Sequence, residues 1–230
     1  MTNRFSAALA APLLLMLAGA APAPATPPAS DVYVAIKTSA GTITLDLDAA
    51  KAPLTTANFL KYVDQKRLDG TTFYRSMHLE WGEQPNGLVQ GGIAASPALA
   101  LKPVAHESTS QTGVLHKAGS ISMARYAPGT ATGDFSILLS DMPGLDADPQ
   151  ATDPDTKAGF AAFGHVVEGM DVVRKIWDAP RSATKGSGVM KGQMIEAPVK
   201  ILTARRVSAP APRPNSVSLP ETSAAASIPQ

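Results

Sequence analysis

The sequence predicts a mainly β fold, in which a closed or nearly closed sheet is covered at its open ends by two helices. Short stretches rich in β-branched and aromatic residues recur along the chain, and clusters of Gly, Pro, Asn and Asp separate them. Such a pattern is typical of strands joined by turns. Two other stretches carry apolar residues at helical spacing, and no internal repeat is visible.

The predicted strands begin with a hairpin. Residues 32–37 and 42–47 are rich in β-branched side chains and flank Ala40 and Gly41, which suit a tight turn. Further strands are predicted at residues 72–77, 88–90, 120–124, 135–139, 160–166 and 199–207.

Each of the two predicted helices has a recognisable boundary. Pro53 suits the first turn of a helix over residues 54–65. The second helix ends before Pro180, which cannot continue it. Its apolar stripe consists of Met170, Val173 and Ile176, with Trp177 beside them.

Composition and charge exclude several classes of function. With 230 residues, 17% of them charged, the chain suits one ordinary globular domain with flanking segments. A formal net charge of +1 gives no electrostatic reason to expect a nucleic-acid partner. The absence of cysteine rules out disulfides, iron–sulfur ligation and thiolate catalysis.

Neither the histidines nor the acidic residues form a metal-binding motif. His78, His106, His116 and His165 contain no pair at the i, i+4 spacing of a helical zinc site. The acidic segment 146–158 lacks the Gly and terminal Glu of a calcium loop. We therefore expect no metal ion and no cofactor.

Residues 1–25 predict a cleavable signal peptide. Arg4 provides the positive start, residues 7–17 form an apolar run, and small residues follow. Because a membrane span needs about 20 apolar residues, we expect export to the periplasm and no stable membrane insertion after cleavage. An uncleaved membrane anchor is the alternative.

The rest of the chain divides into a linker, a domain and a tail. Residues 26–30 are rich in Pro and Ala and predict an extended linker. Residues 208–230 are rich in Pro, Ala and Ser without apolar periodicity, which predicts a disordered C-terminal tail. The folded domain is therefore predicted for residues 31–207.

Several short motifs stand in a characteristic order within this domain. They are Asn58-Phe59-Leu60, Asp69-Gly70-Thr71-Thr72-Phe73-Tyr74-Arg75, Val89-Gln90-Gly91-Gly92, Gly119-Ser120-Ile121-Ser122-Met123-Ala124-Arg125, Thr132-Gly133-Asp134-Phe135, Leu145-Asp146 and Gly159-Phe160-Ala161-Ala162-Phe163-Gly164-His165. Each motif alone is weak, but their succession resembles the cyclophilin family of peptidyl-prolyl cis-trans isomerases over nearly the whole domain.

The resemblance implies a closed, eight-stranded antiparallel barrel capped by two α-helices, with an outer groove that takes an extended peptide at an X-Pro bond. Amide resonance sets a rotation barrier of about 18–20 kcal/mol. A catalyst need only bind the twisted amide better than either planar form, which requires no nucleophile or metal.

The same resemblance assigns the site residues. Arg75 matches the groove arginine, whose guanidinium could hydrogen-bond the prolyl nitrogen as resonance is lost. Gln90 matches the glutamine that holds the neighbouring peptide backbone. Strand alternation predicts that Phe73 shares the face of Arg75, and we expect its side chain mainly to fill the core and to support the site. The predicted substrate-binding residues are Phe73, Leu88, Met123, Ala124, Arg125, Asp134, Ser136, Leu145, Phe160 and Trp81.

The proline pocket departs from the usual family pattern. Gly87 and Gly144 stand where aromatic residues are frequent, Ser136 replaces the second Phe of a pair, and Asp134 replaces a groove Gln. Burial of one aromatic side chain is worth roughly 1.5–3 kcal/mol, so these changes weaken the apolar walls.

The segment before Gly87 offers two interpretations. Residues 76–86 form a longer link than is usual, and Trp81 or Met77 could fold over the groove as a replacement wall. The alternative is a surface loop with an exposed Trp.

Two function classes remain open. One is an isomerase that speeds folding of exported proteins, and the other is a module that holds Pro-containing segments without turning them over. In both, the expected partners are unfolded or extended Pro-containing polypeptides, and the expected state is a monomer.

Overall fold

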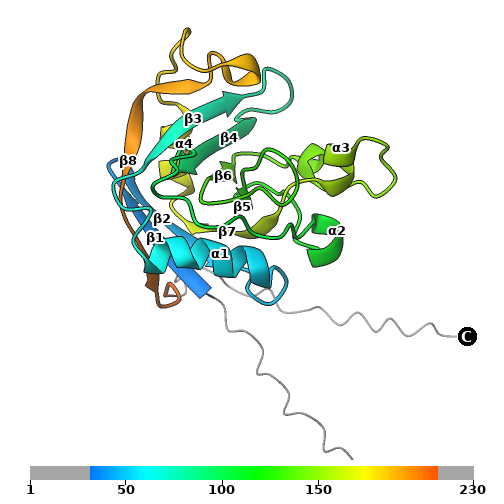
Figure 1. Cartoon of the computed structure of the whole chain (residues 1–230). Helices are drawn as coiled ribbons and strands as arrows, with labels where there is room; N and C mark the ends of the chain where they lie inside the picture. Colours follow the sequence, from blue (N-terminus) through cyan, green and yellow to red (C-terminus); the bar gives the residue numbers. More distant parts are fainter. Residues whose placement is uncertain (1–31, 212–230) are drawn as a thin grey trace, which may run out of the picture.

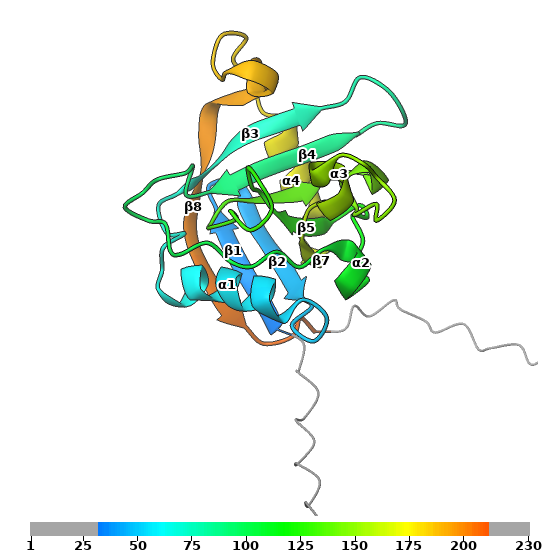
Figure 2. The same ribbon diagram turned by 45° about the vertical axis from the view of Figure 1, so that its right-hand side comes forward.

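Eight strands close into an antiparallel barrel, which confirms the predicted fold class (Figures 1 and 2). The computed structural model describes residues 32–211. Around the barrel the strands follow the order β1-β2-β7-β5-β6-β4-β3-β8, and β8 pairs with β1 to complete the ring. Their bounds are β1 Val32–Thr38, β2 Gly41–Leu47, β3 Thr72–His78, β4 Gly87–Gly92, β5 Ser120–Met123, β6 Phe135–Leu138, β7 Ala162–Glu168 and β8 Met194–Val207.

The two predicted helices are α1 (Pro53–Asp64) and α4 (Met170–Trp177). Figure 1 shows α1 across the lower end of the barrel and α4 behind β3 and β4. Two short helices, α2 (Thr109–Thr112) and α3 (Pro154–Ala158), were not predicted. Helices of four and five residues are too short to leave an apolar stripe in the sequence.

An aromatic cluster fills the barrel. Phe59 of α1 inserts among the strands and meets Phe135 edge-to-face, with ring centroids 5.4 Å apart. Phe73 contacts the same ring of Phe135 at 5.6 Å, and Phe163 contacts Phe59 at 5.4 Å. Each such pair adds roughly 0.5–1.5 kcal/mol beyond burial, so α1 is held to the strands that carry the outer face.

A distant carboxylate caps α1. Ala52 offers no side-chain cap, and Glu107 instead accepts the backbone N–H groups of Leu54 at 3.1 Å and Thr55 at 2.6 Å. A negative charge at a helix N-terminus satisfies free N–H groups and complements the helix dipole. The long connection between β4 and β5 is therefore fixed against α1.

Two strands begin two or more residues away from the position that the sequence pattern predicts. β7 begins at Ala162, because the N–H of Phe160 bonds to the carbonyl of Leu145 and not to a strand. β8 begins at Met194, where it pairs with β3 opposite Arg75. Both changes matter for the site. Phe160 lies in the loop before β7 and lines the cleft, and Gln193 lies just before β8 and contacts Arg75.

The predicted signal peptide and linker lie outside the described residues, as does most of the predicted tail. Within residues 32–211, no helix is long and apolar enough to cross a membrane.

Candidate functional site

A cleft of about 230 Å³ lies on the outer face of the barrel. Strands β3, β4, β5 and β6 form its floor, and two 3₁₀ turns, η1 (Pro143–Leu145) and η2 (Gly188–Met190), contribute to its rim. The lining residues are Arg75, Met77, Leu88, Gln90, Ser122, Met123, Ala124, Arg125, Ser136, Leu145, Phe160, Val189 and Met190. The fold thus brings together most of the residues predicted to form the site.

Strand register sets a polar row across the floor. Arg75 pairs with Gln90, Gln90 with Ser136, and Ser136 with Ser122 on the next strand. Directly paired residues in an antiparallel sheet point to the same face. Side chains from four neighbouring strands therefore line one cleft.

Arg75 is held by two glutamines. Its Nη1 donates to Oε1 of Gln90 at 2.7 Å, and its Nε donates to Oε1 of Gln193 at 2.8 Å. The remaining Nη2 contacts only the weak acceptor Sδ of Met77, at 3.5 Å, among the hydrogen bonds of the described residues. Burial lowers the pKa of Arg75 below its ordinary value, yet a guanidinium stays charged in proteins. The cleft therefore holds a fixed cation with unused donors.

Gln90 connects Arg75 to a second polar group. Its Nε2 donates to the hydroxyl of Tyr74 at 2.8 Å, and that hydroxyl donates to Oδ1 of Asp134 at 3.1 Å. Burial, followed by the charge of Asp134, raises the pKa of Tyr74. Since Gln90 accepts at one end and donates at the other, its amide orientation is fixed.

The apolar side of the cleft comes from strands and turns. Leu88 and Met123 are nearly buried in β4 and β5, while Leu145 and Phe160 lie on the two segments joined by the Phe160 N–H bond. The turn η2 contributes Met190 and the exposed Val189 to the same cleft. Nothing in the sequence predicts η2, because no periodic pattern marks the segment before β8.

Phe73 does not share the face of Arg75, so the predicted alternation is wrong there, but its side chain fills the core as expected. The pairing of β3 with β4 and β8 shifts register between Phe73 and Arg75. A bulge of this kind breaks the two-residue alternation. Phe73 is fully buried inside the barrel, whereas Tyr74 and Arg75 both reach Gln90.

Trp81 does not line the cleft. It is an exposed residue of a surface loop, as the second of the two interpretations predicts. Its exposed fraction is 69%, and it lies in the loop between β3 and β4, which projects from the barrel in both views (Figures 1 and 2). Met77, the other candidate for a replacement wall, does line the cleft.

The two unusual glycines differ in the space around them. A Cβ at Gly87 would clash with the carbonyl oxygen of Met77 and come within 3.1 Å of Nε1 of Trp177. No atom lies within 4 Å of a Cβ built at Gly144. A side chain therefore has room to start at 144 but not at 87.

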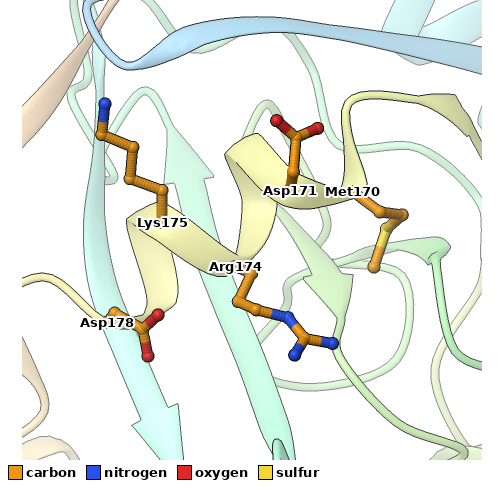
Figure 3. Close-up of a pocket in the computed structure, with 5 residues that line it drawn as sticks. All are labelled: Met170, Asp171, Arg174, Lys175 and Asp178. Atoms are coloured by element: carbon orange, nitrogen blue, oxygen red, sulfur yellow. The ribbon is translucent and has the colours of Figure 1, made fainter.

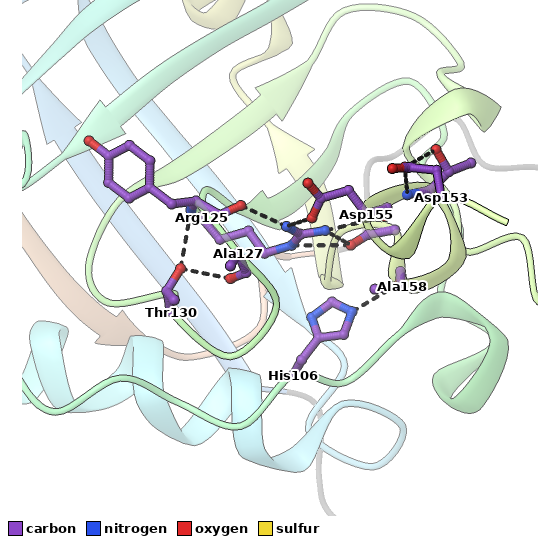
Figure 4. Close-up of polar contacts among 10 residues, drawn as sticks. His106, Arg125, Ala127, Thr130, Asp153, Asp155 and Ala158 are labelled. Atoms are coloured by element: carbon purple, nitrogen blue, oxygen red, sulfur yellow. Dashed lines mark hydrogen bonds and ion pairs between the residues drawn. The ribbon is translucent and has the colours of Figure 1, made fainter. Parts of the chain in front are cut away.

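Arg125 stabilises one wall of the cleft. Its guanidinium lies over the ring of Phe160, 4.5 Å from the centroid. It also donates to the carbonyl of Gly159 at 2.7 Å and pairs with Asp155 at 2.9 Å (Figure 4). With its side chain only 2% exposed, Arg125 ties the α3 loop to the end of β5.

Asp134 lies in a neighbouring hollow of about 310 Å³, which shares Gln90, Ala124, Arg125 and Met190 with the cleft. Its carboxylate accepts the N–H groups of Ala94 at 2.7 Å and Ala95 at 2.9 Å. Both alanines have positive φ, of 50° and 54°, a conformation rarely adopted by non-glycine residues. Asp134 therefore holds a loop beside the cleft.

A separate hollow follows α4 and contains none of the predicted site residues. Met170, Asp171, Arg174, Lys175 and Asp178 line it (Figure 3). In the described part of the chain, no group of three or more His, Cys, Asp or Glu side chains could hold a metal ion.

Comparisons with known proteins agree with this architecture. The family model described as cyclophilin type peptidyl-prolyl cis-trans isomerase/CLD matches residues 33–206. A peptidyl-prolyl cis-trans isomerase of Acinetobacter baylyi is 33% identical over 180 residues, which cover 76% of this chain and 86% of that protein. Peptidyl-prolyl cis-trans isomerase A of Dickeya dadantii is 36% identical over 157 residues, covering 66% of this chain and 75% of that protein.

Solved structures support the fold. A cyclophilin-type isomerase of Cryptosporidium parvum superimposes with a TM-score of 0.58 and 17% identity, covering 78% of this chain and 99% of that one. A second structure of that protein, determined in the presence of the dipeptide Ala-Pro, gives a TM-score of 0.56 and covers 77% of this chain.

Proposed function

Because this chain belongs to the cyclophilin-type peptidyl-prolyl cis-trans isomerases, we propose that it turns over X-Pro bonds in extended segments of exported proteins, with Arg75 as its principal catalytic residue. The isomerase activity follows from the family and its similarly named relatives. The roles of individual residues and the exported location are our proposal.

The observation that carries the proposal is a fixed guanidinium at the edge of an apolar cleft. As the amide twists, its nitrogen gains a lone pair that can accept a hydrogen bond. A donor of Arg75 held at that position would bind the twisted state better than the planar states, which is the requirement for lowering the barrier. Gln90 would then hold both Arg75 and the adjacent peptide backbone.

We propose that the proline ring enters between Leu88, Met123, Leu145 and Phe160. The structure of the Cryptosporidium parvum isomerase determined in the presence of the dipeptide Ala-Pro is consistent with a Pro-containing ligand in this cleft. Apolar contact with the ring would orient the bond, since groups that position a substrate reduce the entropy lost in the transition state.

The test is isomerisation of short Xaa-Pro peptides by the purified protein, with Arg75→Ala and Arg75→Lys beside the wild type. Loss of acceleration in both variants, with an unchanged circular dichroism spectrum, supports Arg75 as a hydrogen-bonding fork and not a simple charge. Full activity in Arg75→Ala would refute its role. A folded wild type without activity on any residue before Pro would favour the non-catalytic binding module.

The periplasmic location rests on the sequence of residues 1–25. Fractionation of a two-membrane bacterium that expresses the full chain should recover the protein in the periplasmic extract, shortened at its N-terminus. Recovery in the membrane fraction at full length would support the uncleaved anchor instead. As a control, a variant without residues 1–25 should stay in the cytoplasm.

A further inference from the structure

Behind the cleft, three side chains form a hydrogen-bonded chain that isomerisation does not use. Nδ1 of His116 lies 2.7 Å from Oδ1 of Asp146, and Nε2 of the same ring lies 2.8 Å from Oγ of Ser122. The His116 side chain is fully buried, and Ser122 lines the cleft. An acid, an imidazole and a hydroxyl are therefore joined in sequence, with the hydroxyl at the cleft end.

The partners determine the direction of each hydrogen bond. Asp146 can only accept as a carboxylate, and its Oδ1 also accepts the backbone N–H of His116 at 3.0 Å. Nδ1 of His116 must therefore carry a proton, which leaves a lone pair on Nε2 in the neutral ring. The hydroxyl of Ser122, a residue only 2% exposed at the floor of the cleft, then donates to Nε2, and its oxygen accepts no hydrogen bond within residues 32–211.

The protonation state of His116 favours this arrangement. Burial lowers the pKa of His116, although the hydrogen bond to Asp146 and its charge oppose the shift. Among the charged groups of residues 32–211, Asp146 is the one that acts on the ring. His116 is therefore neutral at neutral pH and able to accept a proton, while Asp146 would stabilise the imidazolium that forms.

The cleft provides space beside Ser122. Its partner across the β5–β6 ladder is Ser136, a small residue at a position where the resemblance leads one to expect Phe. Within the described part of the chain, the bond to His116 is the single hydrogen bond of the Ser122 hydroxyl. Arg75 lines the same cleft and has an N–H donor bound only to sulfur.

We propose that Ser122 is a nucleophile, activated by His116 and Asp146, that accepts acyl groups from small activated esters entering the cleft. The arrangement meets the general requirement for nucleophilic catalysis, namely a hydroxyl in contact with a base that a third group orients. This acyl transfer is distinct from isomerisation.

The step balances within the site. Oγ of Ser122 bonds to the carbonyl carbon, and its proton moves to Nε2 of His116. The bond from that carbon to the leaving phenoxide breaks, and the phenoxide takes the proton. Water then attacks the acyl carbon, giving a proton to Nε2, and the acid leaves as Ser122 recovers its hydrogen.

The experiment treats the purified protein with phenylmethanesulfonyl fluoride and locates the adduct by peptide mass spectrometry. Displacement of fluoride by Oγ should leave one sulfonyl group on the peptide that contains Ser122. In parallel, p-nitrophenyl acetate should release p-nitrophenol in a burst. Asp146→Asn should slow labelling at least roughly 100-fold, by analogy with loss of the orienting acid in such triads.

The controls separate this chemistry from nonspecific reactivity and from misfolding. Ser122→Ala should abolish the adduct, while Ser140→Ala, whose hydroxyl bonds to Asn86 and to no histidine, should label as the wild type does. Circular dichroism and isomerase activity of each sample report the fold and the first function separately. Labelling elsewhere, no labelling, or equal rates in folded Asp146→Asn would overturn the proposal.

A measurement on the wild type alone covers the case in which the variants do not fold. The labelling rate of the wild type should rise with pH through a single deprotonation below the ordinary histidine value of about 6.5 and then level off. A rate that instead rises steadily to alkaline pH would mean that hydroxide or an unassisted hydroxyl reacts, and would equally refute the activated serine.

Discussion

Nη1 of Arg75 donates to Oε1 of Gln90 at 2.7 Å, across the β3–β4 ladder in which the two residues are paired. Because Gln90 also donates to Tyr74, the glutamine cannot rotate without losing one of its bonds. Gln193, just before β8, holds the other edge of the guanidinium. The orientation of Arg75 therefore depends on two segments far apart in the chain.

This relationship predicts that Gln193→Ala lowers isomerase activity without removing the cation. The variant releases Nε of Arg75, and a hydrogen bond to a charged group is worth about 1.5–3 kcal/mol. If about half of that orients Arg75 in the transition state, kcat/KM falls roughly 3- to 13-fold. Peptide isomerisation kinetics check this. Gln193→Glu keeps an acceptor and should retain most activity, whereas equal loss in both variants would contradict a positioning role.

Most of the barrel could be predicted, because its strands and two longer helices follow the periodicities of their side chains. The start of β8 could not, because Met194 to Pro198 includes Glu196 and a proline and gives no alternating pattern. Its pairing with β3 compensates, since Arg75 and Met194 are direct partners. Tertiary pairing thus overrides local propensity there.

Which residues line the cleft was predictable where motif and strand coincide, as at Arg75 and Gln90. At Phe73 the core position was predicted correctly but the shared face with Arg75 was not, because a bulge reverses the face of every residue beyond it and leaves no mark in the sequence. Nothing in the sequence indicates, either, that the side chains of Ser122, His116 and Asp146 are joined by hydrogen bonds. These residues have no motif spacing and meet only because the turn containing η1 folds back onto β5.

The open space at Gly144 predicts a gain of function. Gly144→Trp should place an aromatic ring beside Leu145 without a clash. Half-burial of that ring against a proline would contribute about 1 kcal/mol, so KM for Xaa-Pro peptides should fall about fivefold. Gly144→Ala is the matched control and should change little. An unchanged KM for the Trp variant would mean that the proline does not approach η1.

The exposed position of Trp81 predicts that Trp81→Ala leaves kcat/KM within about twofold of the wild type, as for most surface substitutions. Fluorescence offers a second readout, because the chain has two tryptophans and Trp177 is 8% exposed. The variant's emission should shift to shorter wavelength. A tenfold loss of activity would instead show that the β3–β4 loop closes over bound peptide.

An ion pair predicts how stability responds to acid. Asp69 accepts from both terminal nitrogens of Arg205, at 2.8 Å for Nη1 and 2.6 Å for Nη2, and from the N–H of Ala204. The hydrogen bond from Arg205 is the main cause that lowers the pKa of Asp69 in the folded chain. The ionised carboxylate therefore stabilises the fold above the unfolded pKa of about 3.9, and this contribution is lost as pH falls through the lower folded value.

Asp69→Asn should accordingly reduce the free energy of unfolding at pH 7 by about 1 kcal/mol, the upper range for a solvent-exposed pair. The difference in unfolding free energy between the variant and the wild type should shrink below about pH 4, as the wild-type carboxylate becomes protonated and loses its charge. Urea denaturation at pH 7 and below about pH 4 measures this difference. Glu83→Gln, an exposed residue of the β3–β4 loop, is the control. A destabilisation that persists unchanged in acid would mean that Asp69 acts through its hydrogen bond to Ala204 and not through its charge.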